Sequence, residues 1–216
     1  CSLDDFYLSS KQREKLANAI HPLFKTRGVP GTHNIELLTR TLENFHRKKV
    51  NWSLTKFDKS SDNPSEKTLW PIIHKAYDVI IIEGWCWGTL AQPNIELTRS
   101  INTLESNHDK ELVWRSYVNQ QIKEHYQPLY QKMDLWIMLQ APSFDVVYQW
   151  RLEQEKKLQH TNNNLFNNKS ANNKVMNAIE VKYFTQHFQR LTKHALETLP
   201  SNVDLLIKLD KQRNVI

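Results

Sequence analysis

Glycine and cysteine are scarce in this chain of 216 residues, and long hydrophobic runs are missing. The two cysteines, Cys1 and Cys86, make no disulfide framework, which favours a reducing compartment such as the cytoplasm. No apolar run approaches the ~18 residues of a membrane-spanning helix, so we expect no membrane partner. The four glycines all lie between residues 28 and 88, where we expect them to serve special backbone positions rather than flexible linkers.

The charge balance is basic but is accompanied by no motif of nucleic-acid recognition. Lys and Arg number 29 against 23 Asp and Glu, which gives a net charge of +6, and the densest basic cluster spans only residues 47–49. Dispersed positive charge suits phosphate or carboxylate ligands as well as nucleic acid. Because no recognition motif is present, we predict no nucleic-acid partner.

Helical and strand-like segments alternate along the chain, which predicts an α/β fold. Four consecutive Val and Ile residues at 79–82 lack the alternation of a half-exposed strand and predict a strand covered on both faces. Strands separated by helices predict a parallel sheet with right-handed crossovers. Residues 161–174 hold seven asparagines and predict an exposed loop or a mobile lid. We expect strands over 78–83, 135–139 and 205–209, and helices over 9–26, from Asn34, from Asp109, over 143–160 and over 177–199.

Carboxylates at the ends of apolar runs are the strongest chemical signals. Asp4 and Asp5 come at the start of the chain, and Glu83 follows the run 79–82 and precedes Gly84. In an open α/β sheet, ligands bind at the carboxyl ends of the strands. An acid there can accept the proton of a substrate hydroxyl, or hold Mg²⁺ directly or through water. The alternative is that both aspartates begin a turn and that Glu83 emerges into solvent. Alternation along a strand end would let only one of Asp4 and Asp5 face the site.

Basic side chains of two loops and one helix complete the candidate set. Arg27 lies in a Gly- and Pro-punctuated segment with His33, and its guanidinium can clamp a carboxylate or phosphate through two nitrogens. Asp58 and Lys59 are adjacent in a mostly polar segment, where they can form an ordinary surface pair. Arg151 stands on a helix before the Asn-rich segment, where basic residues can close over phosphates. The nine histidines show no metal-ligand spacing, so we predict no zinc site.

Together these segments resemble the P-loop kinases of the phosphoribulokinase and uridine kinase group, and within it the glycerate kinase-like branch typified by D-glycerate 3-kinase. The resemblance covers nearly the whole chain, and TRGVPGTH and WRLEQE are its most specific parts. The matching stretches are SLDDFYL (2–8), HPLFKTRGVPGTHN (21–34), FDKS (57–60), VIIIEGWCWG (79–88), LVWRSYVNQQI (112–122) and VYQWRLEQEKKL (147–158).

The resemblance implies a three-layer α/β sandwich with a parallel sheet, in a single P-loop kinase domain over residues 1–216 with a lid at about 151–175. It also implies ATP and Mg²⁺ as cofactors. By the same resemblance, Asp4 matches the catalytic base and Glu83 matches the acid near Mg²⁺. Arg151 matches a lid arginine near the transferred phosphate. Arg27 and His33 fall in one substrate loop, and Asp58 and Lys59 fall in a second substrate loop.

Three departures from the family pattern qualify the expected activity. The Walker A motif, which in the family precedes the stretch matched by SLDDFY, is absent, so we predict that the first strand and the P-loop are missing and that this chain alone is inactive. Asn63 follows Asp62 where the family often has Arg, and the lid segment is rich in Asn rather than Gly.

The reaction that the resemblance implies is phosphoryl transfer from ATP to a hydroxyl of a small hydroxy acid, with D-glycerate as the expected acceptor. Two alternatives stay open. One is a kinase of another acceptor, such as pantothenate, a nucleoside or a sugar-like molecule. The other is a non-catalytic remnant or interaction protein.

Overall fold

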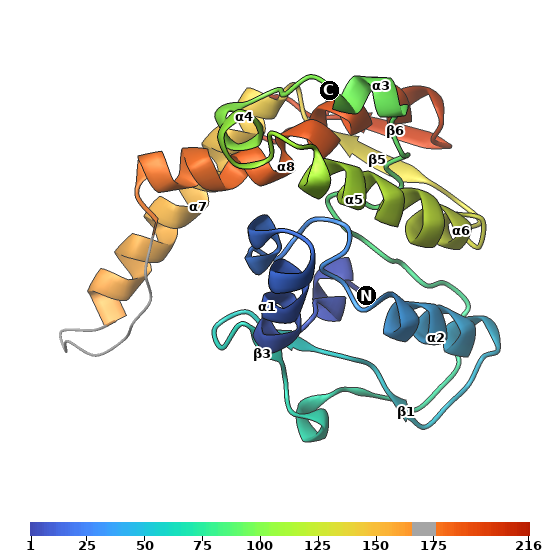
Figure 1. Ribbon diagram of the computed structural model, residues 1–216. Helices are drawn as coiled ribbons and strands as arrows, with labels where there is room; N and C mark the ends of the chain where they lie inside the picture. Colours follow the sequence, from blue (N-terminus) through green and yellow to red (C-terminus); the bar gives the residue numbers. More distant parts are fainter. Residues whose placement is uncertain (166–175) are drawn as a thin grey trace. The chain divides into compact units, whose positions relative to one another are not determined.

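The described chain forms two units, each with its own helices and strands (Figure 1). The computed structural model describes residues 1–165 and 176–216, with side chains over 1–157 and 176–216. The N-terminal unit holds residues 1–100 and 105–134, and the C-terminal unit holds residues 101–104 and 135–216.

Helices account for most of the regular structure, and the strands are short. The α-helices are α1 (Ser10–Ala19), α2 (Ile35–His46), α3 (Asn94–Leu97), α4 (Thr103–His108), α5 (Val113–Gln121), α6 (Gln127–Tyr130), α7 (Phe144–Leu165) and α8 (Ala178–Thr198). The 3₁₀ helices are η1 (Leu3–Phe6), η2 (Pro22–Lys25), η3 (Lys67–Leu69) and η5 (Leu199–Ser201), and η4 (Ile122–Tyr126) is a π-helix. The strands are β1 (Trp52–Ser53), β2 (Phe57–Asp58), β3 (Asn63–Pro64), β4 (Ile72–Ile73), β5 (Ile137–Gln140) and β6 (Leu205–Lys208).

Polar side chains cap the helices where the sequence predicts a helix start. The Asn34 side chain accepts a hydrogen bond from the Leu37 N–H (3.0 Å) and caps α2. The Asp109 carboxylate accepts from the first backbone N–H groups of α5, and Asn177 forms a capping box with Glu180 at the start of α8. Each of these side chains satisfies backbone donors that the helix itself leaves unpaired. The starts predicted at Asn34 and Asn177 are confirmed, whereas the helix predicted from Asp109 begins only at Val113.

Two predicted helix ends differ from the observed ones. The helix expected over 9–26 stops at Ala19, because Pro22 lacks an N–H and cannot continue an α-helix, and the chain turns into η2 instead. The helix expected to end at 160 continues to Leu165. Residues 161–165 contain no Gly or Pro, so nothing in this segment stops the helix from adding one more turn. The rest of the predicted lid, residues 166–175, lies outside the described residues.

Strands β5 and β6 confirm the predicted parallel pairing. They pair in register from Ile137 opposite Leu205 to Gln140 opposite Lys208. The chain between them consists mainly of α7 and α8, so the connection is helical, as the alternation of strands and helices predicted. The other strand pairs, β1 with β4 and β2 with β3, are antiparallel.

The buried strand predicted over 78–83 is wrong. The run is extended, but among the described residues only Cys1–Leu3 pairs with it, through the Glu83 N–H to Cys1 O (3.0 Å) and the Leu3 N–H to Glu83 O (2.8 Å). Val79 and Ile81 are 77% and 73% exposed instead of covered. A β-branched run favours a pleated and packed surface, but it becomes a sheet strand only where neighbouring strands and covering helices are supplied.

Gly84 permits the close approach between this run and the start of the chain. A Cβ atom at Gly84 would lie 2.8 Å from the Leu3 Cβ, closer than real side chains come. Leu3 itself is fully buried, so it cannot move aside. Gly84 thus occupies one of the special backbone positions expected for the glycines, and this contact places Glu83 beside η1, which carries Asp4.

The core of the N-terminal unit fixes the segments that carry the candidate residues. Large fully buried apolar side chains of η1, η2, α2 and η4 contribute to this core. Among them are Leu3, Phe6, Phe24, Leu38, Ile122 and Tyr126.

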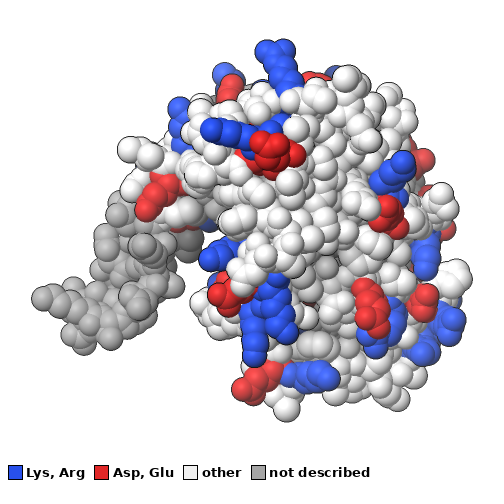
Figure 2. Space-filling model, viewed as in Figure 1, with Lys and Arg blue, Asp and Glu red and all other residues white. Residues whose placement is uncertain are grey.

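The surface shows dispersed charge. On the face drawn in Figure 2, Lys and Arg are interspersed with Asp and Glu and do not gather into a single basic patch. Within the described residues, none of the helices has the length and apolar character needed to span a bilayer.

Candidate functional site

Asp4 carries an ionised carboxylate that is held on two sides. It lies on η1, where the Ser2 hydroxyl accepts a hydrogen bond from its backbone N–H (3.2 Å). The Tyr7 hydroxyl donates to Asp4 Oδ1 at 2.7 Å, and the Lys59 ammonium lies 2.6 Å from Oδ2. Burial raises the pKa of Asp4, but the hydrogen bonds from Lys59 and Tyr7 outweigh burial and hold the pKa below its usual value. Asp4 is therefore a carboxylate at neutral pH.

Asp5 anchors a strand and does not share the surroundings of Asp4. Its carboxylate accepts from the Phe57 N–H of β2 (3.1 Å) and pairs with Lys56 at 3.3 Å. We predicted that the two aspartates alternate across a strand end, and this prediction is wrong. Asp4 and Asp5 instead lie on a 3₁₀ helix that Ser2 caps. The two carboxylates therefore have different surroundings. Asp4 lies beside Tyr7 and Lys59, and Asp5 holds the β2–β3 hairpin.

The loop of residues 27–33 is shaped by two glycines. Gly28 and Gly31 have φ values of 131° and 99°, a left-handed region that other residues adopt only with strain. The Gly28 N–H donates to the Thr32 hydroxyl at 3.0 Å, which closes the loop. The loop presents Arg27 at its start and His33 at its end, so the two predicted substrate-side residues of this segment come from one rigid turn.

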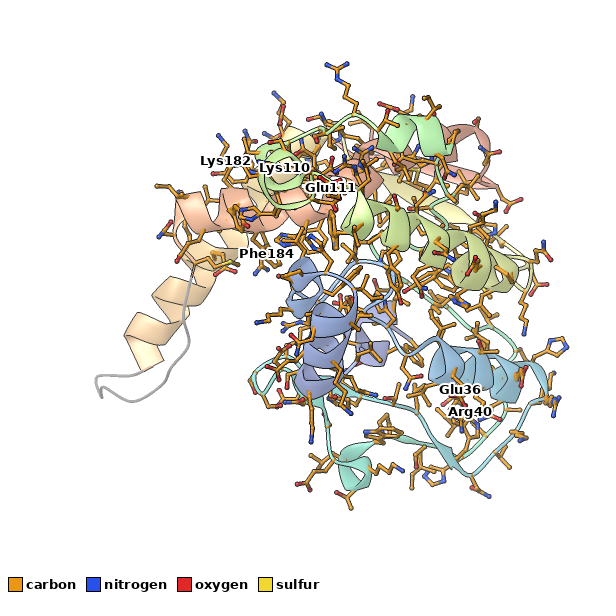
Figure 3. The ribbon with its side chains drawn as sticks, in the orientation of Figure 1. Glu36, Arg40, Lys110, Glu111, Lys182 and Phe184 are labelled. Carbon is orange, nitrogen blue, oxygen red and sulfur yellow. The ribbon has the colours of Figure 1, made fainter. Side chains whose placement is uncertain are left out.

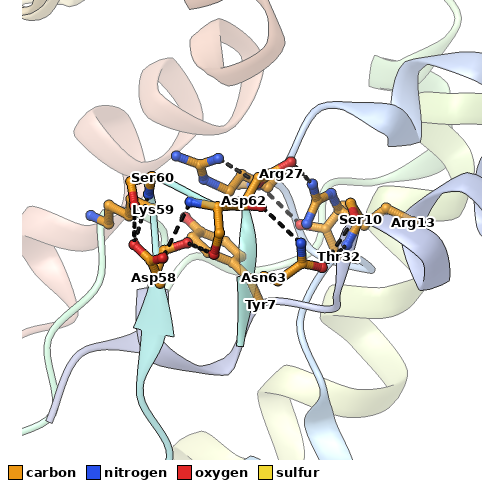
Figure 4. Close-up of polar contacts among 12 residues, drawn as sticks. Tyr7, Ser10, Arg13, Arg27, Thr32, Asp58, Lys59, Ser60, Asp62 and Asn63 are labelled. Carbon is orange, nitrogen blue, oxygen red and sulfur yellow. Dashed lines mark hydrogen bonds and ion pairs between the residues drawn. The ribbon is translucent and has the colours of Figure 1, made fainter. Parts of the chain in front are cut away.

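The Asp62 carboxylate joins two arginines (Figure 4). Oδ1 lies 2.5 Å from Arg27 Nη1, and Oδ2 pairs with Arg13 Nη2. Arg13 is buried and its other nitrogens donate to the carbonyls of Leu8 (2.5 Å) and Lys25 (3.2 Å). The sequence did not mark Asp62 as a site residue. It was named there only because Asn63 follows it where the resembled family often has Arg.

The β2–β3 hairpin separates the roles of Asp58 and Lys59. The Asp58 carboxylate accepts from the Ser60 N–H (2.9 Å), the Ser60 hydroxyl (2.6 Å) and the Ser61 N–H, and these bonds lower its pKa. Asp58 therefore closes its own turn, and Lys59 reaches Asp4 instead. The alternative of an Asp58–Lys59 surface pair is wrong, because the tight turn directs the two side chains to different partners.

His33 is buried between two tyrosines. Its ring stacks on Tyr7 with centroids 4.7 Å apart, and its Nδ1 lies 2.6 Å from the hydroxyl of Tyr126. Burial lowers the pKa of His33 to about 3, although the charge of Asp4 acts in the opposite direction. His33 is therefore neutral at physiological pH. Tyr7 and Tyr126 are neighbours that sequence reasoning missed, and the position of Tyr7 three residues after Asp4 is the only signal that could have found it.

Glu83 lies next to this cluster along the backbone pairing with Leu3. Its side chain is exposed and, within the described residues, makes no hydrogen bond or ion pair. No group of three or more His, Cys, Asp or Glu side chains in the described part of the chain is arranged to hold a metal ion. Mg²⁺ is usually bound by one or two carboxylates together with phosphate oxygens and water, so a single free carboxylate fits that donor set.

Arg151 belongs to the C-terminal unit and is described by itself. On α7 it pairs with Glu155 and donates to Gln154 Oε1 at 3.1 Å. Its guanidinium lies 5.5 Å from the ring centroid of Phe184 on α8, a residue labelled in Figure 3. These contacts fix Arg151 within its own unit.

Tyr7 is the centre around which the N-terminal candidates gather. It donates to Asp4, stacks on His33 and meets the Phe57 ring edge-on at 5.4 Å, while Arg27 lies over that Phe57 ring at 5.6 Å. The arrangement brings an ionised acid, a neutral imidazole and a guanidinium into one connected cluster. Such a set can accept a hydroxyl proton and bind an anionic group.

Comparison with known proteins identifies relatives of this chain. No protein-family model matches it. It is 32% identical over 213 residues to the "Uncharacterized kinase mug58" of Schizosaccharomyces pombe, which covers 94% of this chain and 72% of the relative. It is 28% identical over 241 residues to the "Probable ATP-dependent kinase TDA10" of Saccharomyces cerevisiae, covering 99% and 73% respectively.

A solved structure shows the same fold. D-glycerate 3-kinase from Cryptococcus neoformans var. grubii matches with a TM-score of 0.76 at 21% identity, over 100% of this chain and 77% of that chain. The mixed α/β fold with parallel strands is therefore the fold of a known kinase.

Replacing Lys59 is expected to raise the pKa of Asp4. In Lys59→Met the carboxylate loses a hydrogen bond and a positive charge, while the burial that disfavours its ionised form remains. The measurement is a ¹³C titration of the Asp4 carboxyl. Lys56→Met is the matched control, because Lys56 pairs with Asp5 and should leave the titration of Asp4 unchanged. An identical Asp4 titration in wild type and Lys59→Met would contradict the geometry.

His33 is expected to make stability depend on pH between about 3 and 6.5. In this window unfolded His33 (ordinary pKa 6.5) binds a proton and folded His33 (pKa about 3) does not, so stability is full above 6.5 and falls as the pH drops. At about 1.4 kcal/mol per pH unit, the His33 contribution falls by about 2 kcal/mol from pH 6.5 to 5. Urea unfolding of wild type and His33→Gln at these pH values measures it.

The control for this measurement is the exposed His46, changed to Gln. The stability difference between wild type and His33→Gln should shrink by about 2 kcal/mol between pH 6.5 and 5, which is more than the change for the surface variant His46→Gln. A His33→Gln difference that is the same at both pH values would show that His33 titrates normally in the folded chain.

Proposed function

This chain belongs to the same protein family as the kinase mug58 of Schizosaccharomyces pombe, and from that membership we propose that it forms the acceptor side of a phosphoryl-transfer site. In this proposal ATP phosphorylates a hydroxyl of a small hydroxy acid, and D-glycerate is the acceptor that we assign. The observation that carries the proposal is the Asp4 carboxylate, which Tyr7 and Lys59 hold in its ionised form.

Asp4 orients the acceptor hydroxyl and receives its proton. Two of its lone pairs are taken by Tyr7 and Lys59, and a carboxylate has about four, so room remains for a substrate hydroxyl. Because the pKa of Asp4 is low, it does not deprotonate a free hydroxyl in advance. The proton moves to Asp4 as the new O–P bond forms, which suits a reaction in which positioning and charge stabilisation dominate.

Arg27 supports an acid as the acceptor. Only Nη1 of its guanidinium is used by Asp62, and within the described residues the remaining N–H groups have no partner. A carboxylate accepts two parallel hydrogen bonds from such an edge. His33 and Lys59 complete the acceptor side, and Asp58 contributes by closing the turn that presents Lys59. The structural relative named a D-glycerate 3-kinase agrees with this choice of acceptor.

ATP and Mg²⁺ are the phosphoryl donor and the metal ion that we assign to this site. Bound Mg²⁺ bridges phosphate oxygens and offsets their charge, and Glu83 is the residue that we assign to the ion or its water. Arg151 is assigned to the transferred phosphate. No GxxxxGK[ST] segment occurs in these 216 residues, so none of them is assigned to the triphosphate and the chain alone is expected to show no turnover. We also propose that the chain forms a single three-layer kinase domain and that it acts in the cytoplasm.

The test is an assay of phosphoryl transfer from labelled ATP, with the gene product as the cell makes it and with the 216-residue chain beside it. The acceptors are D-glycerate, pantothenate, a nucleoside and a sugar. We expect transfer to D-glycerate by the gene product only. Asp4→Asn should lower kcat by about 10²- to 10⁴-fold with a smaller change in the KM for D-glycerate.

The control variant is Glu36→Gln, which removes an exposed carboxylate that pairs only with Arg40 on α2 (Figure 3). It should leave both constants unchanged. Transfer to another acceptor would replace D-glycerate, and equal kcat in wild type and Asp4→Asn would refute the role of Asp4. Turnover by the 216-residue chain would show that its own residues bind the triphosphate.

A further inference from the structure

The Arg27 guanidinium is fixed on one edge and on one face. Its Nη1 lies 2.5 Å from Asp62 Oδ1, and its Cζ lies 5.6 Å from the centroid of the Phe57 ring. The side chain is 31% exposed, and within the described residues no other hydrogen bond engages it. An edge of N–H donors is therefore both held in place and open to a ligand. A planar guanidinium edge matches the two oxygens of a carboxylate.

Asp62 is itself held in place by the buried Arg13, which pairs with its second oxygen. That oxygen pairs with Arg13, whose side chain is 2% exposed and whose other nitrogens are bound by the carbonyls of Leu8 and Lys25. Asp62 sits at a φ of 56°, and the following Asn63 accepts hydrogen bonds from the Ser10 N–H and hydroxyl. Figure 4 shows the resulting chain of contacts from Arg13 through Asp62 to Arg27.

The charges of this triad leave one positive charge unbalanced. Arg13 and Arg27 carry two positive charges and Asp62 carries one negative charge, while the nearby Lys59 is paired with Asp4. The positive charge that Arg27 adds to the triad suits an anionic ligand. A neutral hydroxyl compound in its place would leave the Arg27 edge desolvated without a matching anion, which favours acids over polyols.

We propose that Asp62 is a positioning residue that sets the specificity of the site for monocarboxylic hydroxy acids. It holds Arg27 against Phe57 so that the free N–H edge receives the carboxylate of the acceptor with two hydrogen bonds. The inference rests on the proposed function, because it concerns the acceptor of that same site. Asp62 acts through Arg27 and does not touch the reacting hydroxyl.

The experiment measures binding and turnover separately. Calorimetry with the 216-residue chain gives the Kd for D-glycerate and for glycerol, its neutral counterpart. The gene product gives kcat and KM for D-glycerate. Asp62→Asn should weaken D-glycerate binding and raise its KM by about 10-fold, because one charged hydrogen bond no longer orients Arg27, while kcat stays within about 2-fold. Binding of glycerol, weak in wild type, should not change. Asp62→Glu should recover part of the lost affinity.

Two further variants keep the test decisive. Asp78→Asn removes an exposed aspartate paired with Lys48 at 3.4 Å and should leave Kd and KM unchanged. Arg27→Lys keeps the charge but loses the planar edge, and it should weaken D-glycerate binding as much as Asp62→Asn does, even if the latter folds poorly.

Each outcome decides between the inference and the function on which it rests. D-glycerate bound equally well by wild type, Asp62→Asn and Arg27→Lys would overturn the inference and leave the proposed kinase activity standing. A fall in kcat at constant KM would also overturn it, because that would place Asp62 in the chemical step. No binding of D-glycerate to the wild-type chain would overturn both the inference and the assigned acceptor.

Discussion

The ion-paired triad of Arg13, Asp62 and Arg27 is the interaction on which the acceptor side depends. It joins α1, the β2–β3 hairpin and the loop of residues 27–33, three segments that are not adjacent in sequence. A buried guanidinium is costly unless its nitrogens find acceptors, and each of the three nitrogens of Arg13 donates one hydrogen bond, two to carbonyls and one to a carboxylate. The hairpin is thereby anchored, and its turn brings Lys59 to Asp4. The same contact thus orders both a binding arginine and the partner of the acid.

Opposing electrostatic effects then set the protonation states within the cluster. Asp4 and His33 both lose hydration, which disfavours charge on each of them. Asp4 keeps its charge because Lys59 and Tyr7 bond to its carboxylate, whereas His33 has only the Tyr126 hydroxyl on Nδ1 and stays neutral. Asp4 is therefore the negatively charged proton acceptor of the cluster. His33, which stacks on Tyr7, adds no positive charge beside it. Hydrogen bonds therefore keep Asp4 charged, whereas burial keeps His33 neutral.

Local rules predicted much of the fold, and contacts between distant segments accounted for the errors. Asn34 and Asn177 marked helix starts because a cap acts on the backbone N–H groups two or three residues after it. The run 79–82 failed as a buried strand because burial depends on what lies alongside, which the run does not encode. Asp62 and Tyr126 escaped notice for the same reason, since their partners lie 35 to 93 residues away. The motif residues Asp4, Arg27, His33 and Lys59 were found together from the sequence, but their connections through Tyr7 and Asp62 were not.

In the proposed site, Asp4 and Arg27 bind opposite ends of one small hydroxy acid. The decisive experiment is a crystal structure of the chain with D-glycerate. We expect the carboxylate against the free edge of Arg27 and a hydroxyl oxygen about 2.6–3.2 Å from the Asp4 carboxylate. D-glycerate bound away from these two side chains, or with its carboxylate turned toward Asp4, would contradict the account.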